Sequence, residues 1–216
     1  MGFHFKVCAG LLGIVLFGAS IAIAGSADRE ERKVTVLVND SAHVAPSVLR
    51  EAEIEAARIF RAAGVEIEWV GCPVGSVRYE DRCQVIPGEN QYVLHIVPTG
   101  KTSSDLVFGL AFLDEDGHGK YCDVFYNRIA EAHHDSGANL SLLLGMVAAH
   151  ELGHLLLGSH AHSFVGIMTP VWKGDVLRRI DMGNLLFTQE QASVMNARLG
   201  RGEVSLVRVG RGGVGK

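Results

Sequence analysis

The stretch His150-Glu151-Leu152-Gly153-His154 (HELGH) decides how the rest of this chain is interpreted. On an α-helix, residues four apart lie on one face, one turn from each other, so both imidazoles can reach a single metal ion. Glu151, beside the first histidine, can then contact a water on that metal without being a ligand. His150, Glu151 and His154 are therefore candidate residues of one metal site.

The alternative is that both histidines are structural and are satisfied by hydrogen bonds. His150 and His154 continue the apolar stripe of Leu143 and Val147, so this helix face is expected to be buried against the sheet. Two imidazoles and a carboxylate on an inner face would each need a buried partner, which is costly. One metal ion meets all three needs, because the carboxylate is held through the bound water, and this favours the metal site.

Apolar patterning predicts an α+β fold around this helix. Helical spacing over 140–157 ends at Gly158, and two further helices are predicted over 45–63 and 187–199. Alternating or β-branched runs predict strands at 33–39, 65–70, 91–97, 106–113 and 121–126. This order predicts a single domain with a twisted, mostly sequential β-sheet backed by two long helices.

The residues after the helix carry a resemblance to a known class of enzymes. Gly158 can bend the chain back, His160 and His162 come next, and the tripeptide GIM (166–168) follows. A bent helix end, a further histidine and a methionine turn resemble the metzincin clan of zincin metallopeptidases. The string HELGHLLLGSHAHS (150–163) followed by GIM also resembles a group of exported, mostly uncharacterised bacterial zincin-like proteins.

The resemblance implies one catalytic Zn²⁺ ion held by three histidines, with Glu151 as the general base that activates a water. It places Met168 beneath the histidines as a structural residue that binds no metal, although an ordinary core role fits this methionine equally well. It also implies that an extended peptide pairs with the edge strand at 106–113. An edge strand shielded by the acidic loop 114–119 fits the same residues.

Two histidines compete for the third position on the metal. In the metzincin pattern a glycine follows the first histidine by seven residues and the third ligand follows it by ten, which is the offset of His160. Here position 157 is leucine and the glycine is Gly158, one residue later. His160 follows the bend by two residues, whereas His162 follows it by four and has more chain to reach back. We predict His162 as the third ligand, with His160 as the alternative.

Other acidic and histidine-containing segments offer weaker candidates. Glu190 lies where a carboxylate third ligand is conceivable, but a place at a helix cap explains it more simply. His118 lies with Asp114 and Asp116 in a glycine loop that could reach the cleft or hold a calcium ion, and solvated loop charge is the simpler expectation. The segment 133–135 (His-His-Asp) is expected to be a solvated helix end.

Composition and charge exclude several classes of protein. The chain has 216 residues, of which 48% are apolar, 20% charged and 7% aromatic. These values are typical of one globular domain, and not of a disordered, collagen-like or disulfide-dense chain. A net charge of −4 argues against nucleic acid as the main partner, because phosphate binding needs a basic face. The expected partner is a peptide or protein substrate, bound by a monomer.

Residues 1–24 have the pattern of a signal peptide. Lys6 precedes an apolar run, and the sequence Ala-Ile-Ala at 22–24 marks a cleavage point. A retained membrane anchor is the alternative, since the apolar run is only slightly shorter than a membrane span. Cleavage is expected to leave a zincin-like domain over 25–200 and a flexible tail over 201–216, without a stable membrane span, in a secreted or periplasmic protein.

Export also changes what the cysteines are expected to do. Cys72 and Cys83 flank a polar loop, so in an oxidising compartment we expect a disulfide between them. Cys122 lies in an apolar strand and is expected to be a buried free thiol.

Two functions are consistent with this sequence. The first is an exported zinc-dependent metallopeptidase. The second is a non-catalytic, zinc-bearing module on the same scaffold that binds peptide or cell-wall material. Glu151 favours the enzyme, because a purely structural metal site does not need a base beside its ligands.

Overall fold

The computed structural model describes residues 32–72, 83, 86–100, 107–170, 172 and 184–209. In chain order the elements are β1 (Arg32–Asp40), α1 (Pro46–Ala62), β2 (Val65–Gly71), β3 (Gln91–Val97), β4 (Gly109–Phe112), β5 (Tyr121–Phe125), α2 (Tyr126–Ser136), α3 (Leu140–Leu157) and α5 (Gln189–Val209). The fold is α+β, as predicted, and α3 has the bounds expected from the sequence. The predicted signal peptide, 1–24, lies outside the described residues.

The five strands form one mixed sheet in the order β2-β1-β3-β5-β4. β4 lies at one edge, as expected of the strand predicted at 106–113, and pairs antiparallel with β5, whereas the other pairs are parallel. Two of the four neighbouring pairs join strands consecutive in the chain, so the sheet is less sequential than predicted. The reason is that parallel neighbours need crossover connections, and β1 lies between two strands that are both reached in this way.

Helix α2 was missing from the predicted order of elements. It follows β5 without a break, since Phe125 is both the last strand residue and the residue that precedes the helix. Ile129 is its only fully buried residue, so it has little apolar signal of its own. The segment 133–135 lies in its last turn and is exposed, in agreement with the predicted solvated helix end.

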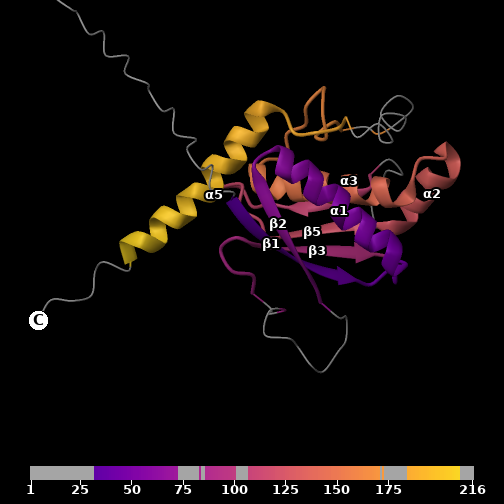
Figure 1. Ribbon diagram of the computed structural model, residues 1–216, viewed down its shortest axis with the longest axis horizontal. Helices are drawn as coiled ribbons and strands as arrows, with labels where there is room; N and C mark the ends of the chain where they lie inside the picture. The colour runs from indigo at the N-terminus through magenta and orange to yellow at the C-terminus, as the bar shows by residue number, and fades with distance from the viewer. Residues whose placement is uncertain are drawn as a thin grey trace, which may run out of the picture.

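Helices α1 and α3 pack side by side against one face of the sheet (Figure 1). They approach closely at Gly145, where a Cβ atom would collide with the backbone carbonyl of Ala52. Of the 18 residues of α3, 83% are buried, although the sequence predicted only one buried face. Among the described residues α3 is the one helix long and apolar enough to cross a membrane, but this burial makes it the core helix of the domain.

Helix α5 begins with a reciprocal cap. The Thr188 hydroxyl accepts a hydrogen bond from the Gln191 N–H (3.2 Å), and the Gln191 side-chain oxygen accepts one from the Thr188 N–H (2.9 Å). The partner of Thr188 is therefore Gln191 and not Glu190, because a capping box joins residues three apart. The helix continues to Val209, beyond the end at Leu199 expected from the sequence.

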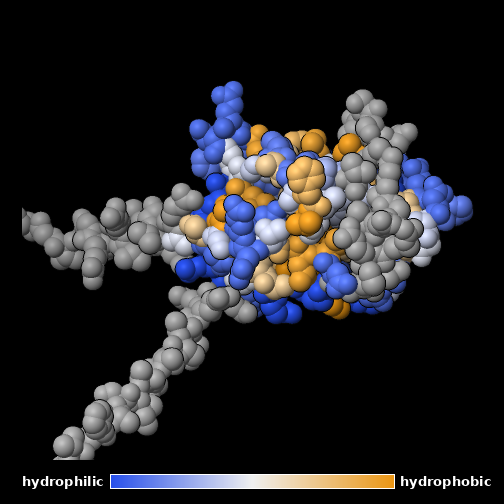
Figure 2. Space-filling view, turned by 90° about the horizontal axis from the view of Figure 1, so that it is seen from above, coloured by the Kyte–Doolittle hydropathy of each residue, from blue (hydrophilic) through white to orange (hydrophobic). Residues whose placement is uncertain are grey.

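A disulfide joins Cys72 to Cys83, the pairing expected from the sequence. It belongs to a small apolar cluster with Leu37, Val70 and Val93 that is separate from the main core. Cys122 is buried and free, also as expected. On the face shown in Figure 2, apolar side chains gather across the middle between hydrophilic ones, so part of the apolar surface stays uncovered.

Candidate metal centre

Helix α3 brings His150, Glu151 and His154 together inside the domain. All three side chains are buried. They line a cavity of about 200 Å³ whose opposite wall is the edge strand β4. The two imidazole rings lie 4.8 Å apart between centroids, as expected for residues one helical turn apart.

Two backbone carbonyls from the chain after α3 determine which nitrogen of each histidine carries a proton. The Nδ1 of His150 lies 2.8 Å from the carbonyl oxygen of Ile167, and the Nδ1 of His154 lies 2.7 Å from that of Ser159. A carbonyl oxygen can only accept a hydrogen bond, so each Nδ1 must be the donor. Each neutral ring is therefore left with an unprotonated Nε2.

These two Nε2 atoms lie only 3.2 Å apart. Because neither carries a proton, the contact brings two lone pairs together and is not a hydrogen bond. Protonating a ring would relieve it, but burial lowers the pKa of His150 to about 3 and that of His154 to about 4. A cation bound by both nitrogens removes the repulsion. Two nitrogens on one tetrahedral zinc ion lie about 3.3 Å apart, given Zn–N bonds of about 2.0–2.1 Å, so the pair fits zinc.

His162 completes a group of three histidines whose potential ligand atoms all lie within 4.8 Å of one another. The chain reaches this position because α3 ends at Gly158, which has the left-handed φ of 64° and reverses the chain. The ring of His162 stacks on that of His150 and meets that of His154 edge-on, with centroids 5.3 and 4.9 Å apart. His160 lines the same cavity but lies outside this group, with its ring 5.9 Å from that of His154.

Glu151 faces the cavity beside the histidines without joining the group of ligand atoms. Its carboxylate accepts a hydrogen bond from the backbone N–H of Ala111 on β4, and burial raises its pKa to about 8. A Cβ atom at position 109 would lie 2.6 Å from Glu151 Cγ, so this carboxylate has room against the edge strand because Gly109 has no side chain. A carboxylate in this position can hold or move a proton next to the histidines.

Met168 is fully buried beneath α3. A Cβ atom on Gly153 would lie 2.9 Å from the Met168 sulfur, so the methionine packs against the helix between the two histidines. Ile167, which provides the carbonyl for His150, is held in turn by a 3.0 Å hydrogen bond from its N–H to the carbonyl of Leu186. This turn positions a histidine and also fills the space under the helix.

Aromatic side chains line the cavity on the His150 side. The Trp172 ring lies 5.8 Å from that of His150 and 6.5 Å from that of Phe108, and its Nε1–H donates to the Thr169 carbonyl. Val147, one turn before His150 on α3, lines the cavity beside them. Trp172 and Phe108 were not among the predicted site residues. Trp172 lies outside every predicted element, and the pattern of the strand predicted at 106–113 does not indicate that Phe108 faces a cavity.

The remaining sequence candidates do not join the site. The described residues contain no second group of three close metal-binding side chains. The Asp114 carboxylate accepts hydrogen bonds from the backbone N–H groups of Asp116 (3.0 Å) and His118 (2.8 Å), so this loop satisfies its own acidic group. Glu190 is exposed in the first turn of α5 and is not part of the histidine group.

Comparison with known proteins gives a limited result. No protein-family model matches the sequence, and no curated protein matches it. The fold is similar to the crystal structure of an archaemetzincin from Methanopyrus kandleri, with 17% sequence identity, a TM-score of 0.49, and coverage of 79% of this chain and 98% of that one. It is also similar to a zinc-dependent peptidase from Methanocorpusculum labreanum, with 15% identity, a TM-score of 0.49, and coverage of 75% and 99%. These values are too low to carry a functional inference.

Proposed function

We propose that this chain is a zinc-dependent metallopeptidase. The proposal is carried by one observation: His150 and His154 direct unprotonated Nε2 atoms at each other across 3.2 Å inside the domain. Such a pair is stable when a cation lies between the nitrogens, and His162 provides a third nitrogen within reach. Three neutral imidazoles suit zinc and leave a fourth position open, which is typical of catalytic zinc sites.

The chemistry then follows from the residues around the histidines. His150, His154 and His162 would hold the zinc ion, which would act as a Lewis acid able to lower the pKa of a water and to polarise the scissile carbonyl. Glu151 accepts the proton of that water and later delivers it to the leaving amine. The Ala111 N–H holds the carboxylate in place from β4. An extended peptide pairs with β4 at the edge of the sheet, which lies across the cavity from Glu151.

We also propose that this metallopeptidase is metzincin-like and exported. Met168 packs under the histidine-bearing helix, which supports a methionine turn. The apolar run within 1–24 supports export and signal cleavage, to a secreted or periplasmic location. The disulfide between Cys72 and Cys83 is consistent with an oxidising compartment. We propose that the mature domain is a monomer that acts on peptide or protein substrates.

The test is a comparison of wild type with Glu151→Gln, which preserves the shape of the side chain but cannot accept a proton. Elemental analysis should find one zinc per chain in both proteins. A digest of a broad peptide library should show cleavage by wild type and none by the variant. Glu115→Gln, in the exposed acidic loop, is the matched control and should cleave like wild type.

Three outcomes would contradict parts of this proposal. Wild type without zinc, after expression with zinc in the medium, would overturn the metal site. Loss of zinc in Glu151→Gln would show that Glu151 is a ligand. Bound zinc without any cleavage would favour the second function, a non-catalytic zinc-bearing module that binds peptide or cell-wall material.

A further inference from the structure

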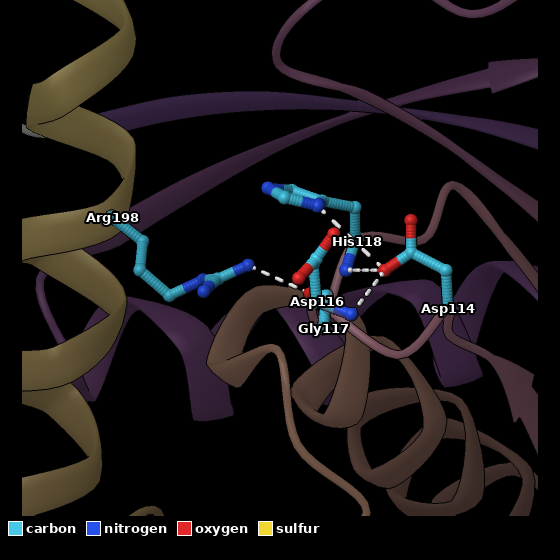
Figure 3. Close-up of polar contacts among 5 residues, drawn as sticks. All are labelled: Asp114, Asp116, Gly117, His118 and Arg198. Carbon is cyan, nitrogen blue, oxygen red and sulfur yellow. Dashed lines mark hydrogen bonds and ion pairs between the residues drawn. The ribbon is translucent and has the colours of Figure 1, made fainter.

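The acidic loop 114–119 has no part in the proposed chemistry, yet its backbone is tightly held. Besides accepting from two later N–H groups, Asp114 accepts a hydrogen bond at its carbonyl from the Gly117 N–H (3.1 Å) and donates its own N–H to the His118 carbonyl (2.9 Å). The carbonyl of Gly117 is thereby presented to α5, where Arg198 Nη2 donates a 2.9 Å hydrogen bond to it (Figure 3).

The same guanidinium group lies directly against the end of α3. A Cβ atom on Gly158 would collide with the guanidinium of Arg198, and a Cβ atom on Gly117 would collide with the carbonyl of Gly158. Three segments that are far apart in the sequence therefore meet at one point: helix α5, the loop between β4 and β5, and the residue that ends α3. A side chain at Gly117 would push the loop away from the end of α3, and a side chain at Gly158 would displace the guanidinium of Arg198.

Gly158 is also the point from which the chain reaches the metal centre. It takes a left-handed conformation, and its N–H donates to the carbonyl of His154. The next residue, Ser159, provides the carbonyl that accepts the Nδ1 proton of His154. His162 follows four residues after the bend. A displacement of Gly158 would therefore change the orientation of one candidate ligand and the position of another.

We propose that Arg198 is a positioning residue of the metal centre. By holding Gly117 and Gly158 together, it keeps the turn that orients His154 and returns His162 to the cavity. The guanidinium suits this task, since it is planar and offers several donors in a fixed arrangement, whereas lysine offers one compact charged group. The inference rests on the proposed zinc site.

Arg198 also has a contact that is unrelated to the metal. Its positive charge favours the ionised form of the nearby Tyr92 hydroxyl, whose pKa is raised overall by burial. That hydroxyl is neutral near pH 7, but removing Arg198 also breaks its hydrogen bond to the Gly117 carbonyl, which can lower the stability of the fold by itself. A useful experiment must measure the metal centre separately from the stability of the fold.

The test is the zinc dissociation constant of Arg198→Met, determined by competition with a chelator at a temperature where the metal-free protein is folded by circular dichroism. The methionine retains an apolar stem but no donor. Zinc should bind about 10–100-fold more weakly, the range found when a group behind a metal ligand is removed. With Co²⁺ in place of Zn²⁺, the visible absorption bands should shift, because His154 is reoriented. Arg61→Met, at the exposed end of α1, is the matched control and should change neither measurement.

A double-mutant cycle tests the route through Gly158. The Cβ atom of Gly158→Ala displaces the guanidinium, so this change should weaken zinc binding less in an Arg198→Met background than in wild type. If the two effects on the dissociation constant multiply, Arg198 does not act through Gly158 and the proposal is wrong. Arg198→Lys, which retains a charge and a donor, should bind zinc with intermediate strength, and it serves as the test if the methionine variant does not fold.

Failure of this proposal is distinguishable from failure of the proposed function. If wild type and Arg198→Met bind zinc equally well and give the same Co²⁺ spectrum, while only the melting temperature falls, Arg198 has a structural role alone. If wild type binds no zinc, both proposals are overturned.

Discussion

Two regions of this domain contain histidine and potential metal ligands at close range, and they differ in what happens to the donor atoms. In the acidic loop, one Asp114 oxygen already accepts two backbone N–H groups, and His118 lies 3.6 Å from the same oxygen. In the candidate metal centre, backbone carbonyls accept hydrogen bonds only from the Nδ1 atoms of His150 and His154. Each Nε2 atom therefore carries no proton and keeps an unshared lone pair. The backbone and solvent satisfy the first region, whereas the second contains two buried lone pairs that a bound cation would satisfy.

The two regions also differ in how far their side chains are exposed to solvent. The side chains of His118 and Asp114 are 73% and 58% exposed, so water solvates whatever the loop does not. His150 and His154 are 8% and 4% exposed, and solvent cannot satisfy them in this way. The proximity of histidine and acidic residues is therefore a poor criterion for a metal site. Buried lone pairs without a hydrogen-bond donor are a better criterion.

The largest expected effect is the loss of a buried ligand. His154→Ala should weaken zinc binding by more than the roughly 10–100-fold typical of groups behind the ligands, because it removes a nitrogen from the metal itself. His118→Ala is the corresponding change in the acidic loop and should leave zinc binding unchanged. Competition titrations of both variants measure the difference. Similar losses in the two variants would refute the distinction between the regions.

The two histidines that follow the bend at the end of α3 should differ in their effect on zinc binding. His162→Ala should weaken zinc binding by more than about 100-fold, while His160→Ala should weaken it by at most roughly 10–100-fold, since only His162 belongs to the group of close ligand atoms. The measurement is a zinc titration of each variant. The reverse ranking would assign the third ligand to His160.

A smaller effect is expected from filling the space beside Glu151. In Gly109→Ala the new Cβ atom would meet Glu151 Cγ at 2.6 Å and the Asp123 carbonyl at 2.7 Å, so the carboxylate must move. Peptide hydrolysis should fall about 10–100-fold, as is typical of a small misplacement of a reacting group, while zinc content stays at the wild-type level. Phe112→Ala, at an exposed position of the same strand, is the control for changes in β4. Unchanged kcat/KM in Gly109→Ala would show that the carboxylate is not confined by the strand.

The smallest effect is expected from calcium. Because the acidic loop uses its carboxylate on its own backbone, millimolar Ca²⁺ should not change the melting temperature of the wild-type protein. Zinc present at about 1,000 times its dissociation constant should instead add about 4 kcal/mol to the free energy of unfolding. Thermal melts with each ion give both values. Stabilisation by Ca²⁺ that disappears in Asp114→Asn would identify the loop as a second metal site.

The local features of this protein could be predicted from its sequence. The bounds of α3 followed from apolar spacing and from Gly158, which allows the left-handed turn that ends the helix. The prediction that His162 is the third ligand rested on counting residues after that turn, and the structure places His162 in the group of three close histidines. The disulfide between Cys72 and Cys83 followed from the short loop between them. Each of these depends on residues that are near one another in the chain.

The features that could not be predicted depend on contacts between distant segments. The strand order could not be read from alternating residues, because each parallel pair is chosen by a crossover and not by a turn. The carbonyl of Ile167, which sets the tautomer of His150, carries no side-chain signal at all. The role of Gly109 in making room for Glu151 could not be predicted either, since a glycine in a strand usually indicates flexibility or a bulge.

The hydrogen bond between His150 and Ile167 sets the order in which the metal centre can form during synthesis. A ribosome completes α3 before it reaches residue 167, and Ile167 is itself held by the carbonyl of Leu186. A nascent chain that ends shortly after α3 thus carries the HELGH histidines without the group that orients the first of them. We expect zinc to be captured only once nearly the whole domain has been made. In the export that we propose above, such a chain would cross the membrane unfolded and metal-free and would acquire its ion on the far side.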